Sequence, residues 1–392
     1  MIDKLIKEIR DVKLEVNSLL SKKKNYTCHH PKCNEKSISS HSISKNTLHL
    51  ISRDGHVIAP QFNRARFSKK DLDFKSTNLC FSPIGVDRAS IFKGFCKSHD
   101  NSVFLNIDNR GIKTNRDISL QIYRTARKFL FTDLAYSKAE LKILGYEYHS
   151  NREFDKSLSI NLEKIIELCE DLLVDFPELD APISINNAET LSIKPFSEKA
   201  SLDVEILYKK VGTVFPVALQ NCFTLSFNGE HSMSLVIITP DETSTNLIIL
   251  SSPNVTPQYS SCINSEINLL NFIESILMQD SDFYLSPNVV ENWSTEKLDA
   301  ITNDFYFFNE RVFLEEYDLS IFDEIRKNIC LTLSENERVA ELKKIYAIPS
   351  RETIEVRHNL QMLGTIKDRH RKLLHTGNIS NTCYPIGSLR IL

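Results

Sequence analysis

Apolar residues recur every three or four positions at the start of the chain, and they mark its first predicted element. Residues 1–22 carry this stripe, and most positions between are Lys, Glu, Asp or Arg. The stripe consists of Ile2, Leu5, Ile9, Val12, Val16 and Leu19. This heptad spacing predicts an amphipathic helix within a first segment of residues 1–24. We expect residues 1–22 either to dock on the rest of the chain or to contact a second copy or another protein.

Helical periodicity returns in residues 111–200. One helix face is predicted from Ile118, Ile122, Ala126, Leu130 and Leu134. A second is predicted within residues 158–174 from Leu162, Ile165, Ile166, Cys169 and Leu173. Both sets keep the spacing that places side chains on one side of a helix.

Residues 201–260 change to a strand pattern. The stretches 215–227, 233–239 and 247–250 are rich in β-branched, aromatic and other apolar residues, and Asn228-Gly229 and Pro240-Asp241 supply turns. This pattern predicts an antiparallel meander. Residues 261–392 return to helical periodicity and end in a basic helix. The fold class expected is therefore α+β, with helices flanking an antiparallel sheet.

Residues 25–110 are rich in Ser, Asn, Lys and His and have few apolar runs. We expect short strands at residues 48–52 and 56–59, joined by a turn at residues 53–55. A segment with so little apolar content needs another source of stability, and a bound metal is one.

Bulk composition narrows the function classes. The chain has 392 residues, with 41% hydrophobic and 25% charged residues and a formal net charge of −3. Those fractions are ordinary for a globular protein, and the charge gives no global attraction to nucleic acid or membrane. No apolar run is long enough to span a membrane. The expected setting is a reducing, cytoplasmic one, in which most of the 9 cysteines remain thiols.

Two cysteine-containing stretches have metal-ligand spacing. Cys28 and Cys33 form a C-x4-C knuckle, and Cys96 and His99 form a C-x2-H pair after Gly94. Thiolates and an imidazole in this Cys3His set suit tetrahedral Zn²⁺. The sequence therefore predicts a structural zinc site in a treble-clef-like module. Two variants stay open: Cys80 in place of Cys96, and His29 or His30 in place of Cys28.

These stretches and the intervening segment 37–46 resemble the zinc-braced HNH, or ββα-metal, nucleases. By position in that family, His41 matches the general base, and Asp100 falls where a metal-binding helix His is expected. The resemblance implies phosphodiester hydrolysis of DNA or RNA with Mg²⁺ or Mn²⁺. Ser40 stands where the family has an acidic residue, and Asn78 is the most convenient match to its central Asn. The other interpretation makes His41 a supporting histidine and the zinc module a part of a noncatalytic sensor or interaction protein.

The phrases at residues 40–43, 55–57 and 94–100 are also similar to a broad group of uncharacterised bacterial proteins with an N-terminal zinc segment. That likeness implies a bacterial or phage-related cytoplasmic setting, with phage defence as one role. It implies no activity.

The basic helix expected at residues 351–376 holds a second candidate site. Arg369 and His375 fit the R-x(4–6)-H pattern and resemble the HEPN ribonuclease motif, which implies metal-independent RNA cleavage. The other interpretation is a solvated or phosphate-contacting basic face. Under that interpretation the nucleic-acid contacts are Arg369, Arg371, Lys372 and His375.

Overall fold

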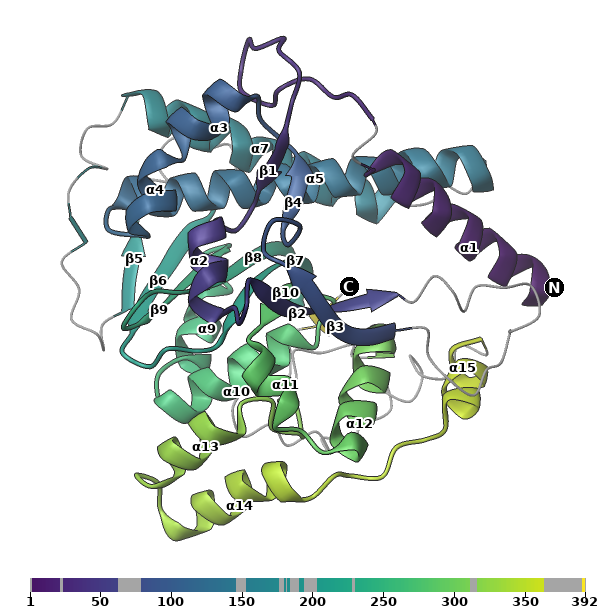
Figure 1. Cartoon of the computed structure of the whole chain (residues 1–392), viewed down its shortest axis with the longest axis vertical. Coiled ribbons are helices and arrows are strands. Elements are labelled where there is room, and N and C mark those ends of the chain that lie inside the picture. The colour runs from purple at the N-terminus through teal and green to yellow at the C-terminus, as the bar shows by residue number, and fades with distance from the viewer. Residues whose placement is uncertain are drawn as a thin grey trace. The chain divides into compact units, whose positions relative to one another are not determined.

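The computed structural model is a mixed α+β structure (Figure 1). The residues it describes are 2–21, 24–62, 79–145, 153–175, 180, 182–183, 190–193, 203–227, 230–310, 316–362 and 390–391. The chain divides into two compact units. The N-terminal unit comprises residues 1–48, 87–186 and 193–204, and the sheet unit comprises residues 49–86, 187–192 and 205–392.

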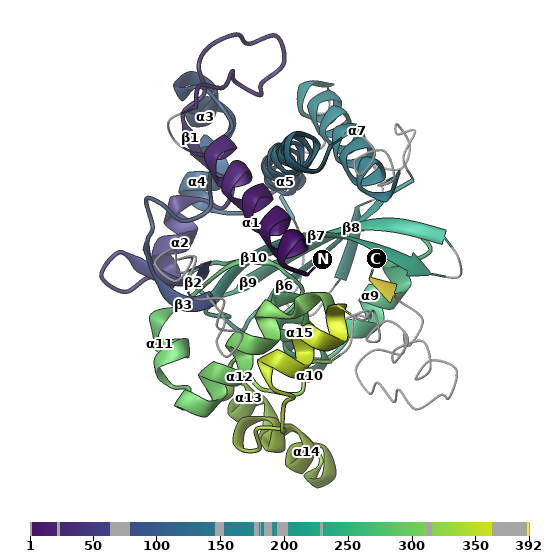
Figure 2. The ribbon, with the colours of Figure 1, turned by 90° about the vertical axis from the view of Figure 1, so that its right-hand side faces the viewer.

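The N-terminal unit is mainly helical. Its helices are α1 (Ile2–Leu19), α3 (Lys97–Val103), α4 (Leu105–Arg110), α5 (Asn115–Leu144) and α7 (Glu153–Asp175). It also holds a two-stranded antiparallel sheet of β1 (Ser39–His41) and β4 (Ile91–Lys93), in which Ser40 pairs with Phe92. The two helices predicted between residues 111 and 175 are confirmed as α5 and α7, which pack side by side (Figure 2).

Helix α5 is buried around most of its first three turns, although many of its side chains there are polar. Thr114 and Asp117 form a capping box, which satisfies two backbone N–H groups at the helix start. Ile118 and Ile122 are buried as predicted, but Arg124 is buried as well. Leu134, predicted on the same face, is exposed. A helix buried on all sides is normally apolar, so these polar residues need internal partners.

Helix α1 docks on α5. Val12 and Val16 are buried against Ala139, and Glu15 pairs with Lys142 at 2.8 Å. The docking alternative for the N-terminal stripe is thus confirmed for its described side chains. The outward Leu14 remains exposed.

The sheet unit is built on one large sheet with the strand order β3-β2-β10-β7-β8-β9-β6-β5, and β11 pairs with β7. Every pairing with a described register is antiparallel. The strands are β2 (His56–Phe62), β3 (Leu79–Gly85), β5 (Thr190–Ile193), β6 (Glu205–Val211), β7 (Val217–Phe227), β8 (Glu230–Pro240), β9 (Thr245–Ser251), β10 (Asp282–Leu285) and β11 (Arg390–Ile391). The meander predicted between residues 201 and 260 is confirmed as β7, β8 and β9; β6 was not predicted as a strand, and it pairs with β9.

Helices after the meander pack on this sheet (Figure 1). They are α9 (Thr256–Cys262), α10 (Glu266–Leu277), α11 (Pro287–Glu291), α12 (Thr295–Tyr306) and α13 (Asp323–Cys330). The short 3-10 helix η3 (Phe308–Glu310), α14 (Glu335–Tyr346) and α15 (Ile354–Met362) contribute none of their described residues to this core. The largest core joins Val236 and Ile238 of β8 with Leu270 and Ile273 of α10. Alternating apolar residues on the strands and a helical stripe on α10 together explain why these elements bury one another.

The hairpin predicted near residue 50 is half wrong. Residues 56–62 form β2, but Lys45–Ile51 form helix α2 rather than a strand. Ser44 caps this helix, because its hydroxyl accepts from Thr47 N at 3.0 Å. The predicted turn is present: Asp54 and Gly55 have φ angles of 51° and 70°, which suits a tight two-residue turn.

Among the described residues, no helix has the length and apolar character needed to cross a bilayer.

Candidate metal centre

The first half of the predicted zinc site is a tight loop closed by backbone hydrogen bonds. Cys28 N donates to Glu35 O at 2.8 Å, and Cys33 N donates to His30 O at 3.2 Å. Lys32 takes a left-handed φ of 59°, which turns the chain back toward the second cysteine. The loop thereby presents the thiols of Cys28 and Cys33 on the same side.

The second half lies at the start of α3. Cys96 is the N-cap residue, with φ −74° and ψ 165°, and Asp100 N donates to Cys96 O at 2.9 Å. His99 follows three residues after Cys96, so both side chains lie on the same side of the first helical turn. Strand β4 and Gly94 lead into this turn, and Gly94 O accepts from His29 N at 2.8 Å. That bond ties the two half-sites together.

The four predicted ligand atoms converge. One atom from each of Cys28, Cys33, Cys96 and His99 lies within 4.8 Å of all the others. His99 Nδ1 is 3.5 Å from Cys28 Sγ and 3.2 Å from Cys96 Sγ, and Cys33 Sγ is 4.0 Å from Cys96 Sγ. Ideal tetrahedral zinc bonds predict S–N edges of about 3.5 Å and S–S edges of about 3.8 Å. These three edges of the cluster are therefore close to those of a zinc tetrahedron, and the cluster can hold a metal ion.

The surroundings favour thiolates once a cation is present. Cys28 Sγ accepts from Cys96 N at 3.1 Å and from His30 N at 3.5 Å. A hydrogen bond with the backbone of His99 lowers the pKa of Cys96, but burial and the neighbouring Cys28 thiol outweigh it and raise that pKa to about 11. A divalent cation reverses this balance, because a coordinating thiol loses its proton.

The two histidines inside the knuckle are not members of the cluster. His29 is half-buried against Phe92, Phe95 and Phe131, and this burial lowers its pKa to about 4. His30 stacks on His99 instead.

The remaining variant, Cys80, is not in the cluster either. Cys80 is exposed on β3, and its thiol donates to Gln61 O at 3.4 Å.

Gly94 is required by the packing beside the site. A Cβ at this position would lie 2.6 Å from Cζ of Phe92, well inside van der Waals contact. The Phe92 ring is itself held by Phe95 and Phe131, so it has little room to move away. The chain thus passes close to Phe92 just before it delivers Cys96.

The structure brings the two predicted catalytic residues into one neighbourhood. His41 is the last residue of β1, and Asp100 lies in the first turn of α3. Burial raises the pKa of Asp100, while a hydrogen bond with Ser40 and the nearby charges of Arg124 and His41 oppose that rise. His41 therefore lies within electrostatic range of Asp100, although 59 positions separate them in the sequence.

A buried polar network next to this pair was not predicted. Arg124 donates to Asp108 Oδ1 at 2.7 Å and to Gln121 Oε1 at 2.8 Å. Gln121 Nε2 in turn donates to the carbonyl of Ser42, the residue after His41, at 2.9 Å. No local sequence motif marks these residues, because their partners come from the residue after β1, from α4 and from α5.

Several predicted residues lie outside the described part of the chain. They are Asn78 and the basic residues Arg369, Arg371, Lys372 and His375.

Comparison of this chain with models of protein families, with curated proteins and with solved structures finds no match.

Proposed function

We propose that this chain binds one structural Zn²⁺ ion through Cys28, Cys33, Cys96 and His99. The observation that carries the proposal is the convergence of four soft or imidazole ligand atoms within 4.8 Å of one another. Four protein ligands leave no open position, which is typical of structural rather than catalytic zinc. Among the described residues this is the only group of three or more His, Cys, Asp or Glu side chains that could hold one metal ion.

Metal content by elemental analysis tests the proposal. Purified wild-type protein is expected to carry one zinc per chain, and Cys33→Ser is expected to lose it. Cys80→Ser is the matched control, because this exposed cysteine lies outside the cluster. Equal zinc content in all three proteins, or none in the wild type, would refute the proposal.

We further propose that the zinc module supports metal-dependent hydrolysis of DNA or RNA, as in the HNH nucleases. What supports this is the order of parts: a knuckle, two antiparallel strands and a helix start, with His41 at the end of β1 and Asp100 on α3. The order matches a treble-clef-like module, and the two candidate residues are neighbours within it.

In this reaction His41 takes a proton from a water molecule whose oxygen bonds to phosphorus. The ester P–O bond then breaks, and the leaving oxygen takes a proton from solvent. Mg²⁺ or Mn²⁺ would neutralise the developing phosphate charge. Asp100 would hold that ion, with substrate phosphate completing its shell, because Mg²⁺ is often bound by one or two carboxylates plus phosphates. Arg124 and Gln121 position the chain around both residues.

Cleavage assays with DNA and with RNA, each with Mg²⁺ or Mn²⁺, test the hydrolysis proposal. Wild type is expected to cleave one substrate, and His41→Ala is expected to lose the activity while keeping its zinc. His49→Ala, at an exposed histidine on α2, is the control for nonspecific effects. Equal cleavage by wild type and His41→Ala, or none by either, counts against catalysis at His41 and leaves the zinc proposal standing.

A further inference from the structure

Helix α14 lies on the surface and divides its apolar residues between two faces. None of its twelve residues is fully buried: Glu341, Leu342, Lys344 and Ile345 are half-buried, while Val339 and Tyr346 are exposed. A surface helix normally buries its apolar stripe and exposes its charges. The exposed pair of apolar side chains is what this rule leaves unexplained.

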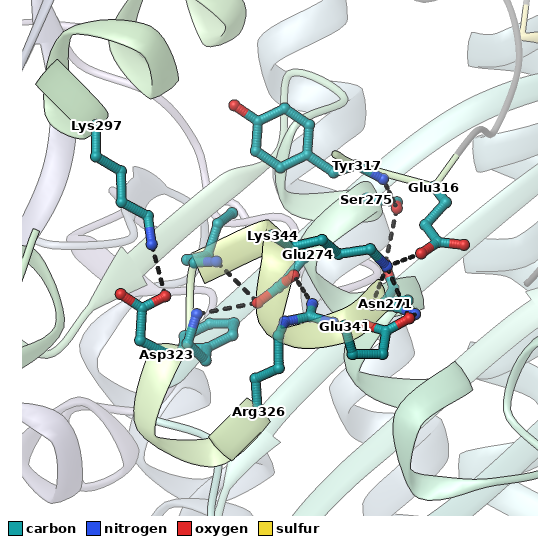
Figure 3. Close-up of polar contacts among 12 residues, drawn as sticks. Asn271, Glu274, Ser275, Lys297, Glu316, Tyr317, Asp323, Arg326, Glu341 and Lys344 are labelled. Carbon is teal, nitrogen blue, oxygen red and sulfur yellow. Dashed lines mark hydrogen bonds and ion pairs between the residues drawn. The ribbon is translucent and has the colours of Figure 1, made fainter. Parts of the chain in front are cut away.

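The inner face is held by ion pairs (Figure 3). Glu341 pairs with Arg326 of α13, and Lys344 pairs with Glu316 and lies 3.0 Å from Glu341. Lys344 Nζ also donates to Asn271 Oδ1 of α10 at 3.2 Å. Ion pairs and a hydrogen bond therefore hold this face, alongside the half-buried Leu342 and Ile345.

This network rests on a fully buried pair. Arg326 and Glu274 are both 0% exposed and form an ion pair. The Glu274 carboxylate also accepts from the backbone N–H groups of Ile321 and Phe322 at 2.8 and 2.9 Å. Ser320 N donates to the carbonyl of Lys344 at 3.0 Å. Arg326 Nε has no hydrogen-bond partner among the described residues, but the ion pairs of Arg326 and the two N–H donors to Glu274 fix the geometry, so the outer face of α14 is held in one orientation.

The outer face carries apolar side chains without cover in the described structure. Tyr346 is 71% exposed and Val339 is 63% exposed, and Leu331, just before the turn into α14, is 77% exposed. These are the three most exposed large apolar residues among those described. Val339 and Tyr346 are seven positions apart, which places them on the same side of the helix.

We propose that α14 is a homodimer interface in which two copies pair antiparallel about a two-fold axis at Val339. The charges on the outer face favour a second copy as the occupant. Glu335 lies four residues before Val339, and Lys343 lies four residues after it. An antiparallel pair centred on Val339 sets Glu335 of each copy opposite Lys343 of the other. Two Glu–Lys contacts of opposite charge therefore form across the axis. Tyr346 of each copy then lies near the α13–α14 turn of the other, where Leu331 is exposed.

The dimer is expected to be weak. A helix of twelve residues is about 18 Å long, so the contact falls at the small end of specific interfaces. We expect a dissociation constant in the micromolar range. Ordinary laboratory protein concentrations exceed this value, so the dimer should be detectable.

Sedimentation velocity of the full-length protein over a concentration series tests the proposal. Wild type is expected to shift from monomer to dimer. Val339→Glu sets two like charges together at the axis and is expected to raise the dissociation constant at least about tenfold. Because Val339 is exposed, the variant is expected to unfold at the wild-type temperature, which calorimetry checks.

Charge reversal gives a second, independent readout. Glu335→Lys alone or Lys343→Glu alone is expected to weaken the dimer. The double variant Glu335→Lys, Lys343→Glu is expected to restore it, because the opposite charges face each other again. Failure of the double variant to recover association would contradict the antiparallel register.

Leu14→Glu is the matched control, because Leu14 is an exposed leucine on α1. It is expected to leave the dimer intact. Dissociation by Leu14→Glu but not by Val339→Glu would assign the interface to α1 and overturn the proposal. A wild type that stays monomeric at all concentrations would overturn it as well.

Discussion

The imidazole ring of His30 lies flat against that of His99, with ring centroids 3.8 Å apart and planes inclined by 1°. His30 thus covers a residue of the candidate metal cluster without belonging to the cluster. We predict that His30→Ala keeps one zinc per chain but releases it to a coloured chelator faster, by up to about tenfold, the size of effect known for supporting residues around metals. His49→Ala serves as the control. An unchanged release rate in His30→Ala would show that the stacking does not protect the site.

Metal removal is predicted to destabilise the N-terminal unit. The ligand pair Cys33 and Cys96 is 63 residues apart, so a bound ion closes a long loop. By analogy with a disulfide, closing such a loop stabilises the fold by about 4 kcal/mol. Hydrogen exchange with and without a chelator measures this, and α3 amides are expected to lose protection. Exchange unchanged by the chelator would mean that the fold does not depend on the ion.

Gly94→Ala is predicted to destabilise the protein by about 1–3 kcal/mol, because the new methyl group overlaps the Phe92 ring. Gly85→Ala is a matched control, since nothing lies closer than 4.0 Å to a Cβ there. Urea unfolding of both variants measures the difference. If the two variants have the same midpoint, the Phe92 ring can move aside and the contact does not constrain residue 94.

Arg326→Met is predicted to cost about 3–5 kcal/mol, because it leaves Glu274 buried without its cation. Lys327→Met, on the next residue of the same helix, removes only an exposed pair with Glu324 and is expected to change stability little. Thermal unfolding compares the two. Adding Glu274→Gln to Arg326→Met is expected to recover part of the loss. A double variant that is no more stable than Arg326→Met alone would argue against an uncompensated charge as the cause.

The stability of the sheet unit is predicted to fall slightly in mild acid because of His358. This ring packs against Tyr306 and Phe307, and burial together with the adjacent Arg357 lowers its pKa. Glu310, which pairs with Arg357, also lies in this region. Because the folded protein favours the neutral His358 imidazole, the stabilisation from this group is fully present above a pH of about 6.5. It is lost as the pH falls toward the lower pKa of His358 in the folded state. Urea midpoints between pH 5 and 8 should fall less steeply in His358→Phe than in wild type.

The parts of the fold that follow from short-range patterns were predictable. The C-x4-C and C-x2-H spacings identified all four cluster residues, because ligand geometry needs fixed local turns. The stripes of α5 and the β-branched runs of β7 to β9 likewise follow local periodicity.

What could not be predicted depends on distant partners. Helix α2 has only seven residues, so its Ser44 cap and burial decide against the strand that its composition suggested. Strand β10 has four residues and exists through pairing with β7. Arg124 becomes part of the candidate site through Asp108, which comes from a different helix. No periodic pattern of residues in the sequence predicts these contacts.

The pairing of β1 with β4 has a practical consequence for isolating the metal module. The intervening strands β2 and β3 belong to the sheet unit, where β2 pairs with β10, so a continuous fragment ending near residue 110 would carry strand edges without their neighbours. Lys45 and Asp87, at the two ends of this excursion, form an ion pair. A short linker joining those two positions would therefore remove β2 and β3 while keeping both halves of the candidate metal cluster in one small protein.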